Sequence, residues 1–331
     1  AKRDAVAGGP SLNFDRMLAA QKPRVSTADL AATILRVSMG VLFLANAYNV
    51  PLDFSQQLGI LALMLITSKG AATVSGGTFV VFAATVTATG VLPLEAVLEV
   101  VFQRGEAMHH LVPRDEQGRS DYRMAAIRPS QFGLADAEVT DFVSGVGAAG
   151  GEFLEVVNLN LLGSQYAIAG TVRGLELLEA EIDRRRAEFG GKRAFILIPG
   201  IDVPFHSSVL RAGVPEFRGK LAELLPADID IDILIGRYIP NLVPRLFNLG
   251  RDFVEEIAAL VPSDPLNEVL ADWDAWEATP NELARVILIE LLAWQFASPV
   301  RWIETQELLF SGPERNGLGV QRFVEIGLKG A

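Results

Sequence analysis

The chain has 331 residues, of which half are apolar, and its 29 Lys and Arg against 40 Asp and Glu give a formal net charge of −11. A chain of this length can bury a large core, and we expect two subdomains. The acidic balance argues against a dedicated nucleic-acid binder, which needs clustered Lys and Arg, and the absence of Cys excludes disulfides, thiolate metal sites and a Cys nucleophile.

The first 94 residues differ in charge from the rest. They carry seven Lys and Arg against four Asp, a net charge of +3, so the remainder carries −14. Uncharged runs at residues 37–52, 58–67 and 70–94 raise the possibility of membrane insertion. The first two runs fall short of the roughly 20 apolar residues that a span requires, and the third is rich in Thr, Gly and Val. A buried core is therefore favoured, and a membrane-associated protein remains as an alternative.

From residue 94 onward the pattern alternates between helical and extended segments. Apolar periodicity and turn residues predict the following elements in chain order: a helix at 94–110, a strand at 122–127, a helix at 135–146, strands at 153–159 and 165–170, a helix at 172–189, a strand at 194–198, helices at 209–225 and 281–296, and a short strand at 322–326. The strands and helices between residues 122 and 198 follow the order β-α-β-β-α-β. This order is typical of a ferredoxin-like subdomain.

His206 is the first candidate for a catalytic residue. It lies in the segment GIDVPFHSS at 200–208, just after a predicted strand, with Pro204 and small hydroxyl residues beside it. A histidine at the end of a strand suits a general base. A hydrogen-bonded loop histidine with no catalytic role is the alternative.

Four segments together resemble a known family. They are GIDVPFHSS at 200–208, VFQRGEAM at 101–108, VPRDEQGRS at 112–120 and GRYIPNL at 236–242. In this order they resemble the malonyl/palmitoyl transferase domain of type I fatty acid synthases of the fungal and mycobacterial kind, over residues 92 to 327. The resemblance implies an α/β fold, with an α/β-hydrolase-like core and an inserted ferredoxin-like subdomain. Residues 1–91 would form a poorly matched part of the core, 92–121 a core helix and loop, 122–199 the ferredoxin-like subdomain, and 200–331 the rest of the core.

The resemblance also assigns roles to residues. It implies transfer of malonyl, and of palmitoyl as a further substrate, between CoA and acyl carrier protein through a hydroxyl-linked acyl-enzyme, with His206 as base. The backbone carbonyl of Gln295 would orient His206, because residues 295–302 match the family's stretch there; a helix end closed by Pro299 is the alternative. Arg104 would grip the malonyl carboxylate with its guanidinium fork. Otherwise it would be a surface arginine paired with a nearby glutamate.

Asn158 and Gln165 border the two central predicted strands. They are candidate substrate-binding residues, although such side chains more often satisfy backbone groups at strand ends. No metal or redox cofactor is expected, and CoA thioesters are the substrates that the resemblance implies. Its implied partners are an acyl carrier protein domain and the other synthase domains in a large homo-oligomer, in the cytoplasm.

No motif of the family identifies the nucleophile in this sequence. Neither a Gly-Gln-Gly loop nor a Gly-His-Ser-x-Gly-Glu elbow, which the family uses, precedes residue 92. An ungapped count places Thr78 at the position of the serine, and Val80 where the elbow needs glycine. Three explanations remain open: a degenerate elbow, an N-terminal part that is not the native partner of the rest, or a domain completed by other segments. A non-catalytic structural domain of the synthase is therefore the main alternative function.

Overall fold

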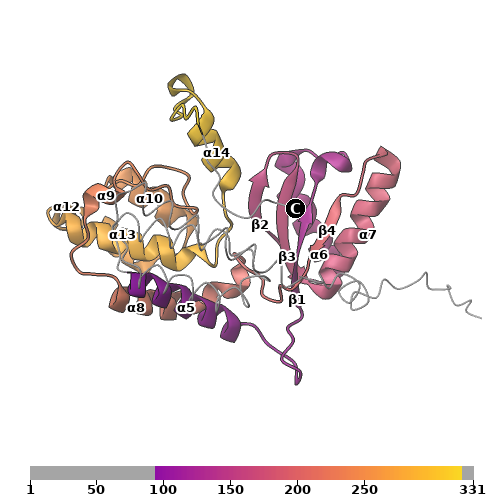
Figure 1. Ribbon diagram of the computed structural model, residues 1–331, viewed down its shortest axis with the longest axis horizontal. Coiled ribbons are helices and arrows are strands. Elements are labelled where there is room, and N and C mark those ends of the chain that lie inside the picture. Colours follow the sequence, from indigo (N-terminus) through magenta and orange to yellow (C-terminus); the bar gives the residue numbers. More distant parts are fainter. Residues whose placement is uncertain (1–93, 323–331) are drawn as a thin grey trace, which may run out of the picture.

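Two units make up the part of the chain that the computed structural model describes, residues 94–322 (Figure 1). One is built around a β-sheet, and the other consists of helices. The predictions for Thr78, for the uncharged runs before Leu94 and for nearly all of the strand at 322–326 lie outside the described residues.

The sheet unit contains four antiparallel strands in the order β2-β3-β1-β4. The strands are β1 (Tyr122–Ile127), β2 (Leu154–Leu161), β3 (Gln165–Thr171) and β4 (Phe195–Ile198). The helices of this unit are α6 (Val139–Gly150) and α7 (Val172–Phe189), and two short 3₁₀ turns, η1 (Pro129–Gln131) and η2 (Asp136–Glu138), precede α6. The prediction of a ferredoxin-like subdomain is confirmed.

Local sequence explains the limits of α7. The Thr171 hydroxyl accepts a hydrogen bond from the Gly174 amide at 3.0 Å, which caps the first turn. Gly190 ends the helix in the left-handed conformation, with φ of 85°. The apolar face of α7 then packs with α6 on one face of the sheet (Figure 1), where Leu175, Leu178 and Ile182 are fully buried.

The helical unit brings α5 together with the C-terminal half of the described chain. Its helices are α5 (Leu94–Leu111), α8 (Val214–Leu224), α9 (Ile231–Leu234), α10 (Arg251–Leu260), α11 (Asp264–Ala271), α12 (Trp273–Glu277) and α13 (Pro280–Gln295), with the 3₁₀ turn η3 (Ser208–Gly213). The last helix, α14 (Trp302–Phe310), and the turn η4 (Pro313–Arg315) after it project away from this unit (Figure 1), and α14 packs against β2 of the sheet unit. Helix α8 packs against both α5 and α13. Phe217, Phe247, Phe253 and Phe296 are fully buried in the core of this unit.

The helical unit departs from the sequence prediction in two ways. The helix expected at 209–225 is divided into η3 and α8, because Pro215 suits the first turn of a new α-helix and lacks the amide that an internal position needs. The sequence prediction also missed α9 to α12 and, outside this unit, α14. Each has ten residues or fewer, and such short helices depend on tertiary packing for their stability.

Helices and sheet together give the α/β class that the sequence predicted. Among residues 94–322, the four strands of the inserted unit are the ones the structure contains. The predicted α/β-hydrolase-like core therefore has no strand of its own in the described part of the chain, where it is represented by helices.

Candidate active site

His206 lies in the connection between β4 and η3, at the junction of the two units. Ile201 and Phe205 of this connection pack on the sheet face that α6 and α7 leave open, beside Met124 and Val157. Phe205 also contacts the core of the helical unit. His206 itself adopts a φ of 62°, which is uncommon for a residue with a Cβ, so contacts on both sides must hold this backbone conformation.

The ends of the His206 connection are tied to the sheet unit and to the segment before it. The two guanidinium nitrogens of Arg114 donate to the Asp202 carboxylate at 2.5 and 3.3 Å. This pairing, ahead of all other causes, lowers the pKa of Asp202 below its usual range. On the other side of His206, the Ser208 amide and hydroxyl both donate to Oε2 of Glu155, at 2.9 and 2.6 Å.

The His206 ring contacts the main chain at the end of α13. Its Nδ1 lies 2.8 Å from the backbone oxygen of Gln295, and its own amide donates to the backbone oxygen of Phe296 at 3.0 Å. A carbonyl oxygen only accepts hydrogen bonds, so Nδ1 carries the proton in this contact and Nε2 is the unprotonated nitrogen of the neutral ring. The ring is therefore in the tautomer that a general base needs.

The pKa of His206 is lowered to about 4, mainly by burial and then by the positive charge of Arg104. The backbone carbonyls of Gln295 and Ser298 act in the opposite direction, because they stabilise the protonated ring. His206 is consequently neutral near pH 7 and able to accept a proton.

Arg104 projects from α5 into the protein, where only 4% of it is exposed. Burial lowers the pKa of its guanidinium to about 9. This burial does not fit the alternative of an exposed surface arginine. Glu99, one of the glutamates near it in the sequence, accepts a hydrogen bond from Gln103 at 2.6 Å. The structure therefore places a buried positive charge close enough to act on His206.

The two candidate substrate-binding residues of the sheet unit lie in different places. Asn158 is half-buried, and its backbone forms an isolated parallel β-bridge with Val300. Val300 follows Gln295 and Ser298, whose carbonyls contact the His206 ring, by a few residues. Gln165 is exposed at the start of β3, opposite Leu161. Leu161 is six residues along β2 from Glu155, a distance of about 20 Å at the usual strand rise. Asn158 thus lies near the site, and Gln165 lies at the far end of the hairpin.

A buried ionic cluster near the site was missed by the sequence analysis. Glu290 of α13 is 1% exposed, and its Oε2 accepts hydrogen bonds from Arg218 at 2.8 Å, Ser263 at 2.6 Å and Trp294 at 3.2 Å. An isolated glutamate inside the apolar run 286–294 was the sequence signal for it, because a charge is buried only when it is paired. This cluster joins α13 to α8 and to the start of α11, five residues before Gln295.

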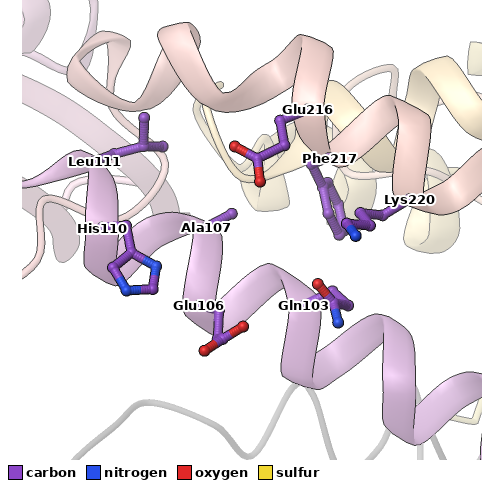
Figure 2. A pocket seen from close by; sticks show the side chains of 8 residues that line it. All are labelled: Gln103, Glu106, Ala107, His110, Leu111, Glu216, Phe217 and Lys220. Carbon is purple, nitrogen blue, oxygen red and sulfur yellow. The ribbon is translucent and has the colours of Figure 1, made fainter.

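A groove between α5 and α8 is separate from His206. Its volume is about 220 Å³, and Figure 2 shows Glu106 and His110 of α5 and Glu216 and Lys220 of α8 among the side chains that line it. None of the sequence-predicted site residues lines this groove. The candidate active site is thus the junction around His206.

Comparison with known proteins gives relatives for most of the chain. Fatty acid synthase 2 of Mycosarcoma maydis is 35% identical over 282 residues, which cover 74% of this chain and 8% of that protein. The fatty acid synthase subunit beta of Saccharomyces cerevisiae is 30% identical over 248 residues, which cover 62% of this chain and 12% of that protein. The chain is therefore related to these synthases and spans about a tenth of their length.

A solved structure supports the fold. The malonyl-CoA:acyl carrier protein transacylase FabD of Xanthomonas oryzae is 18% identical and superposes with a TM-score of 0.50, over 91% of this chain and 80% of that one. Likeness at this level of identity concerns the fold alone, and it agrees with the α/β class.

The N-terminal part of the chain matches a different family. Residues 22–103 match the model of the sodium:dicarboxylate symporter family, and of these the structure describes residues 94–103. The matched range covers most of residues 1–91, the part of the chain that does not resemble the transferase domain. Among residues 94–322, no helix is long and apolar enough to cross a bilayer.

Proposed function

We propose that this chain, as a relative of the fungal fatty acid synthases, provides an acyltransferase domain that moves malonyl groups, and palmitoyl groups as further substrates, between CoA and acyl carrier protein. The observation that carries the proposal is the 2.8 Å contact between His206 Nδ1 and the backbone oxygen of Gln295. It fixes the tautomer in which Nε2 accepts a proton, with a main-chain carbonyl in the place of the usual carboxylate.

His206 would act as base and then as acid. In the first half-reaction, Nε2 takes the proton of a hydroxyl as its oxygen attacks the thioester carbonyl of acyl-CoA. The protonated ring then gives that proton to the departing CoA sulfur, and an oxygen ester remains on the enzyme. In the second half-reaction, the carrier-protein thiol loses its proton to His206 and attacks the ester, and the protonated ring returns that proton to the departing oxygen, which regenerates the enzyme hydroxyl. The carbonyls of Gln295 and Ser298 stabilise the imidazolium that forms in each step.

Arg104 would recognise the free carboxylate of malonyl. A guanidinium binds a carboxylate through two parallel hydrogen bonds, and burial strengthens such a pair. A bound malonyl group would also offset the charge of Arg104, and this would raise the pKa of His206 toward a value better suited to a general base. Asn158 is proposed to line the acyl site beside Val300, and Gln165 would contact only a substrate that reaches the end of the hairpin.

The hydroxyl nucleophile is proposed at Thr78 on the sequence count alone, since that residue lies outside the described part of the chain. A non-catalytic domain of the synthase is the second candidate function. The absence of a Gly-His-Ser-x-Gly-Glu motif from the sequence favours it, because a threonine is more hindered than the serine of the family's elbow.

The remaining expectations are part of the same proposal. Acyl transfer between sulfur and oxygen is redox-neutral, and the proposed steps use no metal or redox cofactor. The proposed partners are CoA thioesters, an acyl carrier protein domain and the other domains of a large synthase oligomer, in the cytoplasm. The N-terminal match to symporters keeps a membrane-associated protein as a further alternative, and partition of the whole chain between aqueous buffer and detergent tests it.

Intact-mass measurement after mixing the chain with malonyl-CoA tests the proposal. A covalent malonyl adduct that hydroxylamine removes, and that His206→Ala prevents, is the expected result. A second variant combines Gly77→His, Thr78→Ser and Val80→Gly to rebuild the elbow pattern, and it should form more adduct than the unmodified chain. If neither chain forms an adduct, the non-catalytic function is the better description.

A further inference from the structure

Strand β2 lies at the edge of the sheet and contacts two segments that meet at His206. One is the connection after β4, which contains Ser208, and the other is the stretch after α13, which contains Val300. Toward one of them, Glu155 of β2 accepts two hydrogen bonds on a single carboxylate oxygen, from the amide of Ser208 at 2.9 Å and from its hydroxyl at 2.6 Å. Ser208 is two residues after His206. Hydrogen bonds to an ionised carboxylate are stronger than neutral ones, so this contact fixes the chain immediately beyond the base.

Toward the other segment, β2 pairs through its backbone with Val300. The Val300 amide donates to the Val157 oxygen at 2.9 Å, and the Leu159 amide donates to the Val300 oxygen at 3.0 Å. Val157 is the extra residue of a register shift against β3, which lies between Val156 and Asn158. Val300 is two residues after Ser298, whose carbonyl, with that of Gln295, faces the His206 ring.

One strand thus fixes the positions of the base and of its main-chain acceptors. The His206 backbone, with its positive φ, would relax to a commoner conformation if one of the two attachments were lost. The Val300 attachment uses main-chain atoms and survives most substitutions. The Ser208 attachment depends on the side chain of Glu155, 53 positions earlier in the sequence.

We propose that Glu155 is a positioning residue for His206: its carboxylate holds Ser208 so that Nδ1 of His206 stays on the Gln295 carbonyl. The catalytic meaning of this contact rests on the proposed function. The hydrogen bonds of the Glu155 carboxylate go to Ser208, and Glu155 would act on the ring through the two chain positions that separate Ser208 from His206. The sheet unit therefore contributes directly to the geometry of a site whose other parts belong to the helical unit and the connection after β4.

The test is Glu155→Ala in the full chain, with Glu152→Ala as a matched control. Glu152 belongs to the same unit, and its carboxylate also accepts a hydrogen bond from a hydroxyl, that of Thr171, at 2.7 Å. The chain has three histidines, so ¹³C labelling of histidine allows the ring of His206 to be followed by NMR and assigned from the signal missing in His206→Gln.

In Glu155→Ala, the titration midpoint of His206 should rise from about 4 toward the ordinary value of 6.5, because the released ring becomes more hydrated. Glu152→Ala should leave the midpoint unchanged. In a chain that transfers acyl groups, Glu155→Ala should lower kcat about 10- to 100-fold with little change in KM, as a poorly placed base would. Glu155→Gln keeps the size of the side chain and one acceptor oxygen. It should therefore retain most of the transfer rate, and its His206 midpoint should stay close to about 4.

A His206 midpoint that is the same in Glu155→Ala and in the unmodified chain would overturn the proposal. If Glu155→Ala does not fold, Glu155→Gln and Ser208→Ala decide, since each removes part of the contact and should raise the midpoint by a smaller amount. The titration needs no turnover. A chain that forms no acyl adduct but whose His206 responds to Glu155 contradicts only the proposed function, whereas an active chain whose His206 ignores Glu155 contradicts only the positioning role.

Discussion

The sheet unit and the helical unit differ in what they bury. The buried polar or charged residues of the described chain are Arg104, Ser120, Ser207, Ser263, Glu290, Ser298, Thr305 and Ser311. None of them lies between Tyr122 and Ile198. The core of the sheet unit is built from aliphatic and aromatic side chains, and the hydroxyl of its buried Tyr166 donates to Asp136. The sheet unit is thus an apolar frame, and the buried polar groups that chemistry can use lie outside residues 122–198.

This difference separates two kinds of substitution. Changes in the sheet core should lower stability without altering what the site does per folded molecule. Changes at the polar groups of the junction should alter the chemistry more than the stability. Glu155 is the exception that the geometry singles out, because it belongs to the sheet unit and holds the segment of His206.

The largest expected effect on activity is that of His206→Ala. Loss of a general base that works with its nucleophile should lower acyl transfer about 10³-fold or more, while the fold persists because the ring fills little of either core. Adduct formation followed by mass spectrometry and unfolding by circular dichroism measure the two quantities. Full transfer activity in this variant would remove His206 from the mechanism and leave the junction without a base.

The largest expected effect on stability is that of Glu290→Ala. It leaves Arg218, Ser263 and Trp294 without the acceptor they share, and breaking a buried ion pair costs about 3–5 kcal/mol. The matched variant in the sheet unit is Glu181→Ala, which removes a partly exposed pairing with Arg184 and Arg185 and should cost less than about 1 kcal/mol. Urea unfolding of both variants checks the prediction, and equal losses would contradict it.

Leu178→Ala tests the apolar frame. Leu178 is fully buried between α7 and the sheet, and its truncation should lower the free energy of unfolding by about 2–5 kcal/mol. The adduct yield per folded molecule should stay the same, because the cavity forms on the sheet face opposite to the His206 connection. A selective loss of activity at full folding would show that the two faces are coupled.

Arg104→Ala should weaken malonyl transfer relative to acetyl or palmitoyl transfer. A lost charge-assisted, two-pronged hydrogen bond costs about 1.5–3 kcal/mol, which corresponds to about 10- to 100-fold in kcat/KM. Competition between malonyl-CoA and acetyl-CoA measures the selectivity directly. Equal decline for all acyl groups would make Arg104 a structural residue of the helical unit.

The smallest expected effect is a pH dependence of stability from His206. Its pKa is about 4 in the folded chain and 6.5 as the ordinary value, so the unfolded chain binds more protons between these values. The contribution to stability is complete above pH 6.5 and is lost as the pH falls through 6.5 toward 4. Thermal unfolding at pH 7 and pH 5 should therefore show a smaller decrease in Tm for His206→Gln than for the unmodified chain, and identical decreases would contradict the assignment.

How far the sequence predicted the structure also differs between the two units. In the sheet unit, the strand at 122–127 and the helix at 172–189 were predicted within the observed limits, because alternating apolar residues, Thr171 as a cap and Gly190 as a stop are local signals. In the helical unit, the helices from α9 to α12 were missed. Ser263 with Pro265 one residue into α11 was a usable start signal, but the segments are too short for periodicity to decide.

By itself, then, the sequence determined the order of the sheet unit and, through the resemblance, the pairing of His206 with the Gln295 carbonyl. Only the tertiary structure decided that Arg104 is buried, that Glu290 is paired with Arg218 72 positions away, and that Glu155 holds Ser208. The physical reason is range. Periodicity and caps act between residues a few positions apart, whereas the desolvation of a charge depends on which distant segments exclude water from it.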